Sequence, residues 1–178
     1  MAIDTLRAVG FCAHYSKHGD WAFDFALRLS QKHNLKLNVF HFLADPYNPN
    51  DSTGQYMNAE ERNRLAVEKE RKLRMYYDDL AGDYLDVGFR LCFDNEWTEL
   101  HKCLIVREFQ ILVLGYPSQD ATFAGKKIID FANSFISPVV LVGPDSPEQL
   151  YLNRQAALIS HKFGLEDIHW VNLDQTFA

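Results

Sequence analysis

Residues 111–131, with the sequence ILVLGYPSQDATFAGKKIIDF, combine residue types and spacings that could bind an anion. A short apolar run leads into a polar loop, and the loop leads into a segment with helical periodicity. In α/β proteins this strand–loop–helix arrangement holds phosphate at the helix N-terminus. Glycines permit a close backbone approach, hydroxyl groups donate hydrogen bonds and lysines supply positive charge. The candidate anion-binding residues are Gly115, Ser118, Thr122, Gly125, Lys126 and Lys127.

The spacing in this loop leaves two interpretations open. The GxxxxGK[ST] pattern is missing, so we do not predict a Walker-type nucleotide site. Cations near a helix N-terminus oppose the helix dipole, so Lys126 and Lys127 favour a bound anion or an acidic neighbour such as Asp120. Alternatively, the helix begins near Ser118, which would leave both lysines as solvated side chains in its second turn.

A second polar segment, HYSKHGD at residues 14–20, follows the first apolar run. Together with the end of the next run it supplies four further candidate ligand-binding residues: His14, Tyr15, Ser16 and His41. We predict no metal site, because Gly19 interrupts the segment and no Cys or carboxylate completes a ligand set. No G-x-S-x-G elbow is present. We therefore predict no catalytic residues, and the sequence does not indicate an enzyme.

Composition and charge exclude several classes of protein. The chain has 178 residues, of which 47% are hydrophobic, and a net charge of −6, which argues against a nucleic-acid partner. Its apolar runs are shorter than the roughly 18 residues that span a bilayer, and the N-terminal residues lack a signal-peptide pattern. Three cysteines without CxxC spacing are expected to be buried thiols. We expect a cytoplasmic protein without a membrane partner.

Buried strands alternate with amphipathic helices along most of the chain. Apolar runs predict strands near residues 6–13, 35–42, 84–93, 109–115 and 137–144. The charged run EERNRLAVEKERKLR, residues 60–74, mixes acids and bases and is interpreted as the solvated face of a helix. This alternation predicts an α/β fold, a Rossmann-like three-layer sandwich around five parallel strands. Ligands of such sheets bind at the carboxyl ends of the strands.

The residues after the fifth predicted strand are treated as a separate extension. We divide the chain into an α/β domain at residues 1–144 and a C-terminal extension at residues 145–178. PEQLYLNRQAALISHKFG, residues 147–164, predicts a helix that ends at Gly164, and DIHWVNL, residues 167–173, predicts a short strand. Their apolar residues require a surface to bury against, either on the same chain or on a partner subunit.

Taken together, residues 6–142 resemble the universal stress protein family, which has an adenine-nucleotide α-hydrolase-like (HUP-type) fold. Three stretches carry the resemblance: VGFCAHYSKHGDWAFDFALRLS, LNVFHF, and ILVLG followed by AGKKIIDFANSFISPVVLVGP. The resemblance implies a sheet in the order 3-2-1-4-5 and a homodimer formed through the fifth strand. It also implies a structural role for His41, which stands where the family often has a histidine.

The chain departs from the family's ATP-binding pattern on both sides of the nucleotide. Gly115 and Gly125 match the first and third glycines, whereas Ser118 replaces the second and Lys126 replaces a hydroxyl residue. The loop is three residues shorter than in ATP-binding members. At the first strand, His14 and Tyr15 replace an acidic residue and a glycine, and only Ser16 matches.

Two functions follow from the resemblance. The first is a non-enzymatic stress-response regulatory protein that acts as a homodimer, docks an unidentified partner protein and has a degenerate nucleotide site without a cofactor. The alternative is a module that binds ATP, AMP or another anion through a remodelled phosphate loop, with slow ATP hydrolysis.

Overall fold

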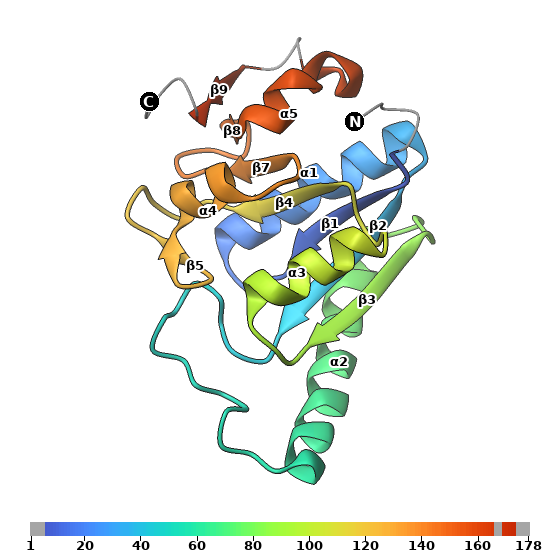
Figure 1. The fold of residues 1–178 in the computed structure, drawn as a ribbon. Coiled ribbons are helices and arrows are strands. Elements are labelled where there is room, and N and C mark those ends of the chain that lie inside the picture. Colours follow the sequence, from blue (N-terminus) through green and yellow to red (C-terminus); the bar gives the residue numbers. More distant parts are fainter. Residues whose placement is uncertain (1–5, 166–168, 174–178) are drawn as a thin grey trace.

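A parallel sheet forms the centre of the molecule (Figure 1). The computed structural model describes residues 6–165 and 169–173. Within them the main sheet runs in the order β3-β2-β1-β4-β7-β8-β9. Its strands are β1 (Ala8–Cys12), β2 (Lys36–Phe42), β3 (Val87–Cys92), β4 (Ile111–Gly115), β7 (Val139–Val142), β8 (Leu150–Leu152) and β9 (Trp170–Asn172). The first five of these are parallel and lie in the predicted order, so the α/β fold class is confirmed.

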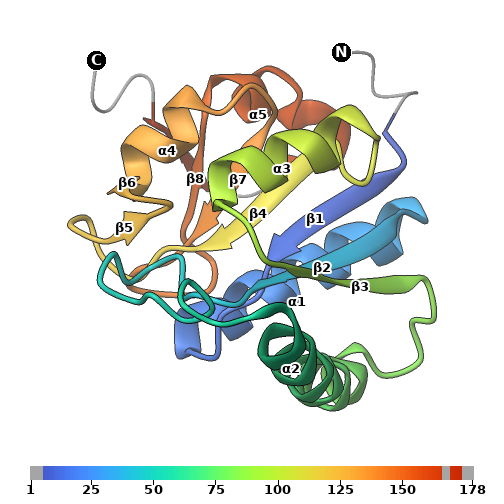
Figure 2. The ribbon, with the colours of Figure 1, turned by 60° about the horizontal axis from the view of Figure 1, so that its bottom comes forward.

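Helices cover both faces of the sheet, as Figure 2 shows. They are α1 (Lys17–His33), α2 (Ala59–Ala81), α3 (Glu96–Ile105) and α4 (Ile128–Ser134). On one face α1 and α2 pack against the sheet, where Phe11 of β1 contacts the rings of Phe23 and Tyr77. On the other face, Leu100 of α3 and Phe131 of α4 are fully buried. Strands buried on both sides explain the nearly continuous apolar runs in the sequence.

The sheet is longer than predicted, because the C-terminal segment adds two strands. β8 pairs antiparallel with β7, and β9 pairs with β8. The prediction of one helix over residues 147–164 is therefore wrong: a strand comes first, followed by the short α5 (Arg154–Leu158) and the 3₁₀ helix η2 (Ser160–Phe163). Gly164 ends the helical stretch at φ 70°, as predicted. The predicted terminal strand is confirmed at Trp170–Asn172, while residues 167 and 168 lie outside the described part.

Asn153 anchors the segment after β8 to the rest of the molecule. Its side chain is fully buried and makes four hydrogen bonds. The Oδ1 atom accepts from the backbone N–H groups of Val139 and Ala156. The Nδ2 group donates to the carbonyl oxygens of Ala132 and Ser137. One amide thus caps α5 and joins β7 to the end of α4, and all its hydrogen-bonding capacity is used.

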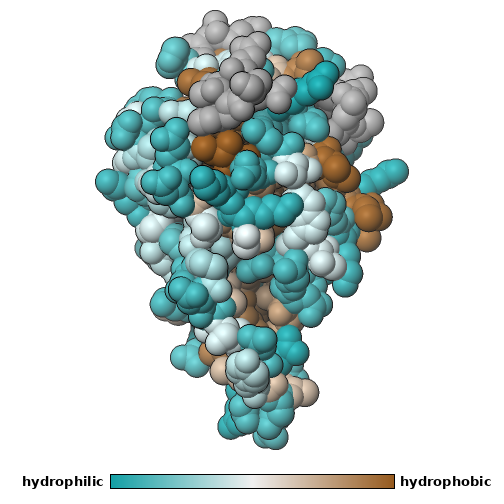
Figure 3. All heavy atoms as spheres, turned by 60° about the vertical axis from the view of Figure 1, so that its left-hand side comes forward, coloured by the Kyte–Doolittle hydropathy of each residue, from teal (hydrophilic) through white to brown (hydrophobic). Residues whose placement is uncertain are grey.

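The carboxyl end of the sheet is covered by two connections. Residues 43–58 form a long loop between β2 and α2, which runs past a small antiparallel hairpin of β5 (Thr122–Phe123) and β6 (Lys126–Lys127) (Figure 1). Figure 3 views the molecule from the side of this hairpin, and the visible face is mainly hydrophilic with small, separate hydrophobic areas.

Replacing Asn153 with Ala should destabilise the protein by about 2–4 kcal/mol, because several buried backbone groups lose their partners. Urea unfolding would measure the change. The matched control is Asn133→Ala on the exposed side of α4, for which we expect less than about 0.5 kcal/mol. Equal stability of the two variants would contradict the anchoring role.

Candidate functional site

The loop after β4 folds into a hairpin rather than an open phosphate loop. Ala124 and Gly125 occupy its turn at φ 55° and φ 78°, the left-handed conformations of a tight hairpin turn. Phe123 is fully buried beneath it. Helix α4 begins only at Ile128, so the alternative of a helix that starts near Ser118 is wrong. The short length of the connection and its turn residues favour this hairpin.

The polar residues predicted in this loop do not converge on one point. Lys126 places its ammonium group 4.1 Å above the ring centre of Trp97, in a cation–π contact with α3. Lys127 and Ser118 are exposed. Thr122 donates its hydroxyl hydrogen bond to the carbonyl oxygen of Tyr47. Each of these side chains thus has its own local environment, and an anion site at this loop stays a prediction.

Gly115 is required by packing. A Cβ atom on Gly115 would lie 2.8 Å from the carbonyl oxygen of His18, in the first turn of α1. At Gly19 the equivalent distance to the carbonyl oxygen of His14 would be 1.9 Å. The start of α1 therefore sits directly against the end of β4. The glycine that resembles the first residue of a phosphate loop permits this contact between backbones.

Tyr47, from the long loop after β2, contacts both the end of β4 and the hairpin. Its hydroxyl group donates a 2.7 Å hydrogen bond to the carbonyl oxygen of Gly115. Its ring centre lies 5.1 Å from that of Phe123 and 4.4 Å from that of His14. Burial raises the pKa of Tyr47 well above its ordinary value, so the hydroxyl remains a donor. Sequence reasoning missed this residue, although an aromatic residue within a polar turn segment was a signal.

The four candidates near β1 and β2 have distinct local roles. Ser16 is the N-cap of α1, and its hydroxyl oxygen accepts from the N–H group of Gly19. Nδ1 of His14 shares a 2.8 Å hydrogen bond with the same hydroxyl group, and Nε2 lies 3.2 Å from a carboxylate oxygen of Asp45. Tyr15 lies with its ring centre 5.7 Å from that of His41.

A pocket of about 260 Å³ opens between these residues at the carboxyl ends of β1 and β2. Three predicted residues line it: His14, Tyr15 and His41. Asp45, Asp51, Lys69 and Lys72 complete its polar lining. The sequence pattern did not indicate these four residues, because the acids lie in a turn-rich loop and the lysines in a mixed charge run. Among the residues described, no group of His, Cys, Asp and Glu is arranged to hold a metal ion.

His41 is the buried polar residue of this pocket, and 9% of it is exposed. Burial, together with the charges of Lys69 and Lys72, lowers the pKa of His41 from 6.5 to about 4. Its imidazole is therefore neutral at physiological pH. Nδ1 is buried and has no hydrogen-bond partner in the described part of the chain.

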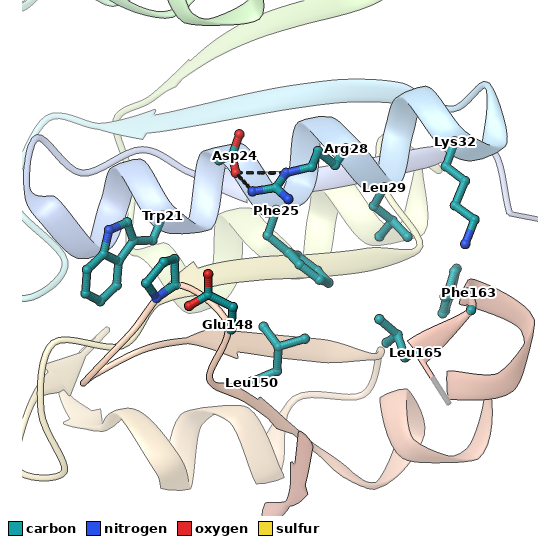
Figure 4. A pocket seen from close by; sticks show the side chains of 12 residues that line it. Trp21, Asp24, Phe25, Arg28, Leu29, Lys32, Glu148, Leu150, Phe163 and Leu165 are labelled. Carbon is teal, nitrogen blue, oxygen red and sulfur yellow. Dashed lines mark hydrogen bonds and ion pairs between the residues drawn. The ribbon is translucent and has the colours of Figure 1, made fainter. Parts of the chain in front are cut away.

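A second hollow of about 270 Å³ lies between α1 and the C-terminal segment (Figure 4). Trp21, Phe25 and Leu29 form its wall on α1, and they face Leu150 and Leu165 across the hollow. The Asp24–Arg28 ion pair lies along the rim. None of the predicted site residues lines it.

The fold and the carboxyl-end pocket together define an α/β protein with a mostly parallel sheet and a polar pocket at the carboxyl ends of β1 and β2. Searches of protein-family models and of curated proteins find no match for the sequence. No helix in the described residues is long and apolar enough to cross a membrane.

Solved structures of universal stress proteins share this fold. A universal stress family protein from Burkholderia pseudomallei is 15% identical, with a TM-score of 0.54 over 77% of this chain and 96% of that one. The universal stress protein UspA from Lactobacillus plantarum is 14% identical, with a TM-score of 0.54 over 78% of this chain and 98% of that one. The predicted resemblance is therefore confirmed for the fold, in a highly divergent sequence.

The depressed pKa of His41 predicts a loss of stability in acid. The unfolded chain takes up a proton near pH 6.5, whereas the native state resists protonation until about pH 4. The contribution of His41 to the free energy of unfolding is thus fully present above pH 6.5 and decreases as the pH falls toward 4. Between pH 7 and pH 5 we expect the free energy of unfolding to fall by about 2 kcal/mol.

NMR titration of the imidazole, with urea unfolding at both pH values, would test this prediction. The His41→Gln variant should lose this part of the pH dependence, and a control at exposed His161 should keep it. A His41 that titrates near pH 6.5 in the native protein would contradict the assignment.

Proposed function

We propose that this chain is a non-enzymatic regulatory protein of the universal stress protein type whose nucleotide site is degenerate. One observation carries the proposal: Tyr47 is hydrogen-bonded to Gly115 and occupies the region that a nucleotide's phosphates would need. A second contact, from the N–H group of Ala124 to the carbonyl oxygen of Pro46, holds the same loop against the hairpin.

The hydrogen bonding of the loop supports this proposal. Triphosphate binding requires several backbone N–H groups to converge on its oxygens. The N–H groups of Tyr116, Ala121 and Ile128 already bond to carbonyl oxygens of Val142, Ser118 and Ala121. Pro117 has no N–H group to offer. Few amides therefore remain for a phosphate, and the alternative function requires Tyr47 to leave and the hairpin to refold.

We also propose that the chain forms a homodimer that docks a partner protein, as expected from the family resemblance. Its interface would differ from the predicted one, because β7 is paired on both sides, with β4 and β8. The expectation that the fifth strand is an edge is therefore wrong. β9 lies beyond β8 at this end of the sheet, and exposed strand edges commonly support association.

ATP and AMP should bind more weakly than about 0.1 mM, which corresponds to less than roughly 5.5 kcal/mol of binding free energy. Isothermal titration calorimetry would measure this directly. In a Tyr47→Ala variant, any residual ATP affinity should increase, because the phosphate region opens. Micromolar ATP binding to the unchanged chain, or ATP that copurifies in stoichiometric amounts, would favour the alternative function instead.

Light scattering should give the full chain a mass of two 20.6 kDa subunits. Truncation after Pro144 removes β8 and exposes the apolar edge of β7, so we expect a higher mass or aggregation. Monomers of both chains at micromolar concentration would exclude the homodimer.

A further inference from the structure

We propose that the pocket at the ends of β1 and β2 binds a small organic oxyanion, a carboxylate or a phosphate monoester, through Lys69 and Lys72 of α2. The inference rests on the proposed function, in which the phosphate region is closed and the chain binds rather than catalyses. It concerns a different set of residues from the lysines predicted in the loop after β4.

Lys69 and Lys72 are three positions apart on α2, so they lie side by side on one face of the helix. Both line the pocket, and the charge of each lowers the pKa of His41, which places both close to that ring. Nζ of Lys72 lies 4.8 Å above the ring centre of Tyr15. None of the ion pairs found in the described residues includes either lysine.

The two acids of the pocket are already engaged elsewhere. Asp45 lies within ion-pair distance of His14 and accepts from the N–H group of Tyr47. One oxygen of Asp51 accepts from the N–H group of Asp45, and the other accepts from the N–H and hydroxyl groups of Thr53. These hydrogen bonds, with a smaller effect from the charge of Lys69, lower the pKa of Asp51. The formal charges of the pocket cancel, but both carboxylates are hydrogen-bonded within the loop, whereas neither ammonium group takes part in an ion pair found in the described residues.

His41 is a second observation that points to a ligand. It is more than nine-tenths buried, lines the pocket, and has one ring nitrogen without a hydrogen-bond partner among the described residues. Because its pKa is about 4, the ring is neutral and carries one N–H donor. A buried polar group without a partner is costly, so a bound ligand or water is expected beside such a ring.

Size and lining limit the ligand. The volume of about 260 Å³ is at the lower end of small-molecule sites. The remaining lining is apolar: Ala13, Phe42, Leu43 and Pro46. A compact apolar body with one anionic group would therefore suit the pocket.

Binding can be tested by NMR titration of the full chain with benzoate, phenyl phosphate, inorganic phosphate and the uncharged analogue benzamide. We expect benzoate or phenyl phosphate to shift the signals of Tyr15 and His41 and to bind more tightly than benzamide. The Lys69→Met/Lys72→Met double variant, which keeps the aliphatic stems, should bind at least about tenfold more weakly, equivalent to about 1.4 kcal/mol.

The matched control is Lys126→Met/Lys127→Met, which removes the same charge from the hairpin and should change the affinity less than about twofold. Equal losses in both double variants would overturn the proposal, since attraction would then follow net charge alone. The proposal would also be overturned if inorganic phosphate bound as tightly as both organic probes, because the site would then hold an adventitious ion only. Thermal unfolding would show whether each variant is folded. The His41→Asn variant is an independent test and should bind benzoate more weakly.

The outcomes separate this inference from the proposed function. Weak ATP binding together with no response to any anion overturns the inference and leaves the closed nucleotide site intact. Micromolar ATP binding that is insensitive to the two α2 lysines overturns the proposed function, and the inference with it, because the inference depends on a closed phosphate region.

Discussion

The close approach between the first turn of α1 and the end of β4 is the constraint on which the candidate site depends. A side chain at Gly115 would overlap the backbone of His18 and Gly19 in the first turn of α1. At the same end of α1, the N-cap Ser16 bonds to His14, and His14 lies within ion-pair distance of Asp45. The carbonyl oxygen of Gly115 is then positioned to accept from Tyr47. Gly115 thus permits the contact with α1 and supplies the acceptor for Tyr47.

The loop after β2 and the hairpin after β4 hold each other in place. The loop contributes Pro46 and Tyr47, and the hairpin contributes Thr122, Phe123 and Ala124. Each side supplies hydrogen bonds that the other needs, and the ring contact of Tyr47 with Phe123 removes the remaining space. Opening this region would expose a buried aromatic residue and several backbone groups at once, which is energetically unfavourable.

The C-terminal segment changes the surface available for association. β8 and β9 extend the sheet beyond β7, and Asn153 secures their connection through four hydrogen bonds in the interior. The same segment closes one side of the hollow against α1. An apolar strand that would otherwise be an edge is therefore protected within the subunit. Any assembly of this chain must use surfaces other than that strand.

Sequence periodicity by itself determined the α/β class, the five parallel strands and most helix positions. A strand that is buried on both faces has a continuous run of apolar residues, whereas a helix that is buried on one face has an apolar stripe with a period of about 3.6 residues. Motif order also indicated the universal stress protein fold and a departure from its ATP pattern. Of the candidate site, only His14, Tyr15 and His41 were brought together as ligand-pocket residues.

The rest was decided by tertiary contacts. Lys69 and Lys72 belong to a mixed charge run, and only the packing of α2 against the sheet, where it contacts β3, separates them from other solvated lysines. Leu150–Leu152 has the apolar character of either a strand or a helix, and the open edge of β7 selected the strand. Tyr47 carries no local signal of its hydrogen bond to Gly115, because the two residues are 68 positions apart. Asn153 has the residue type of a helix N-cap, but its hydrogen bonds to Ala132, Ser137 and Val139 join distant parts of the chain. Such contacts exist only once the chain has folded, which is why they could be seen only in three dimensions.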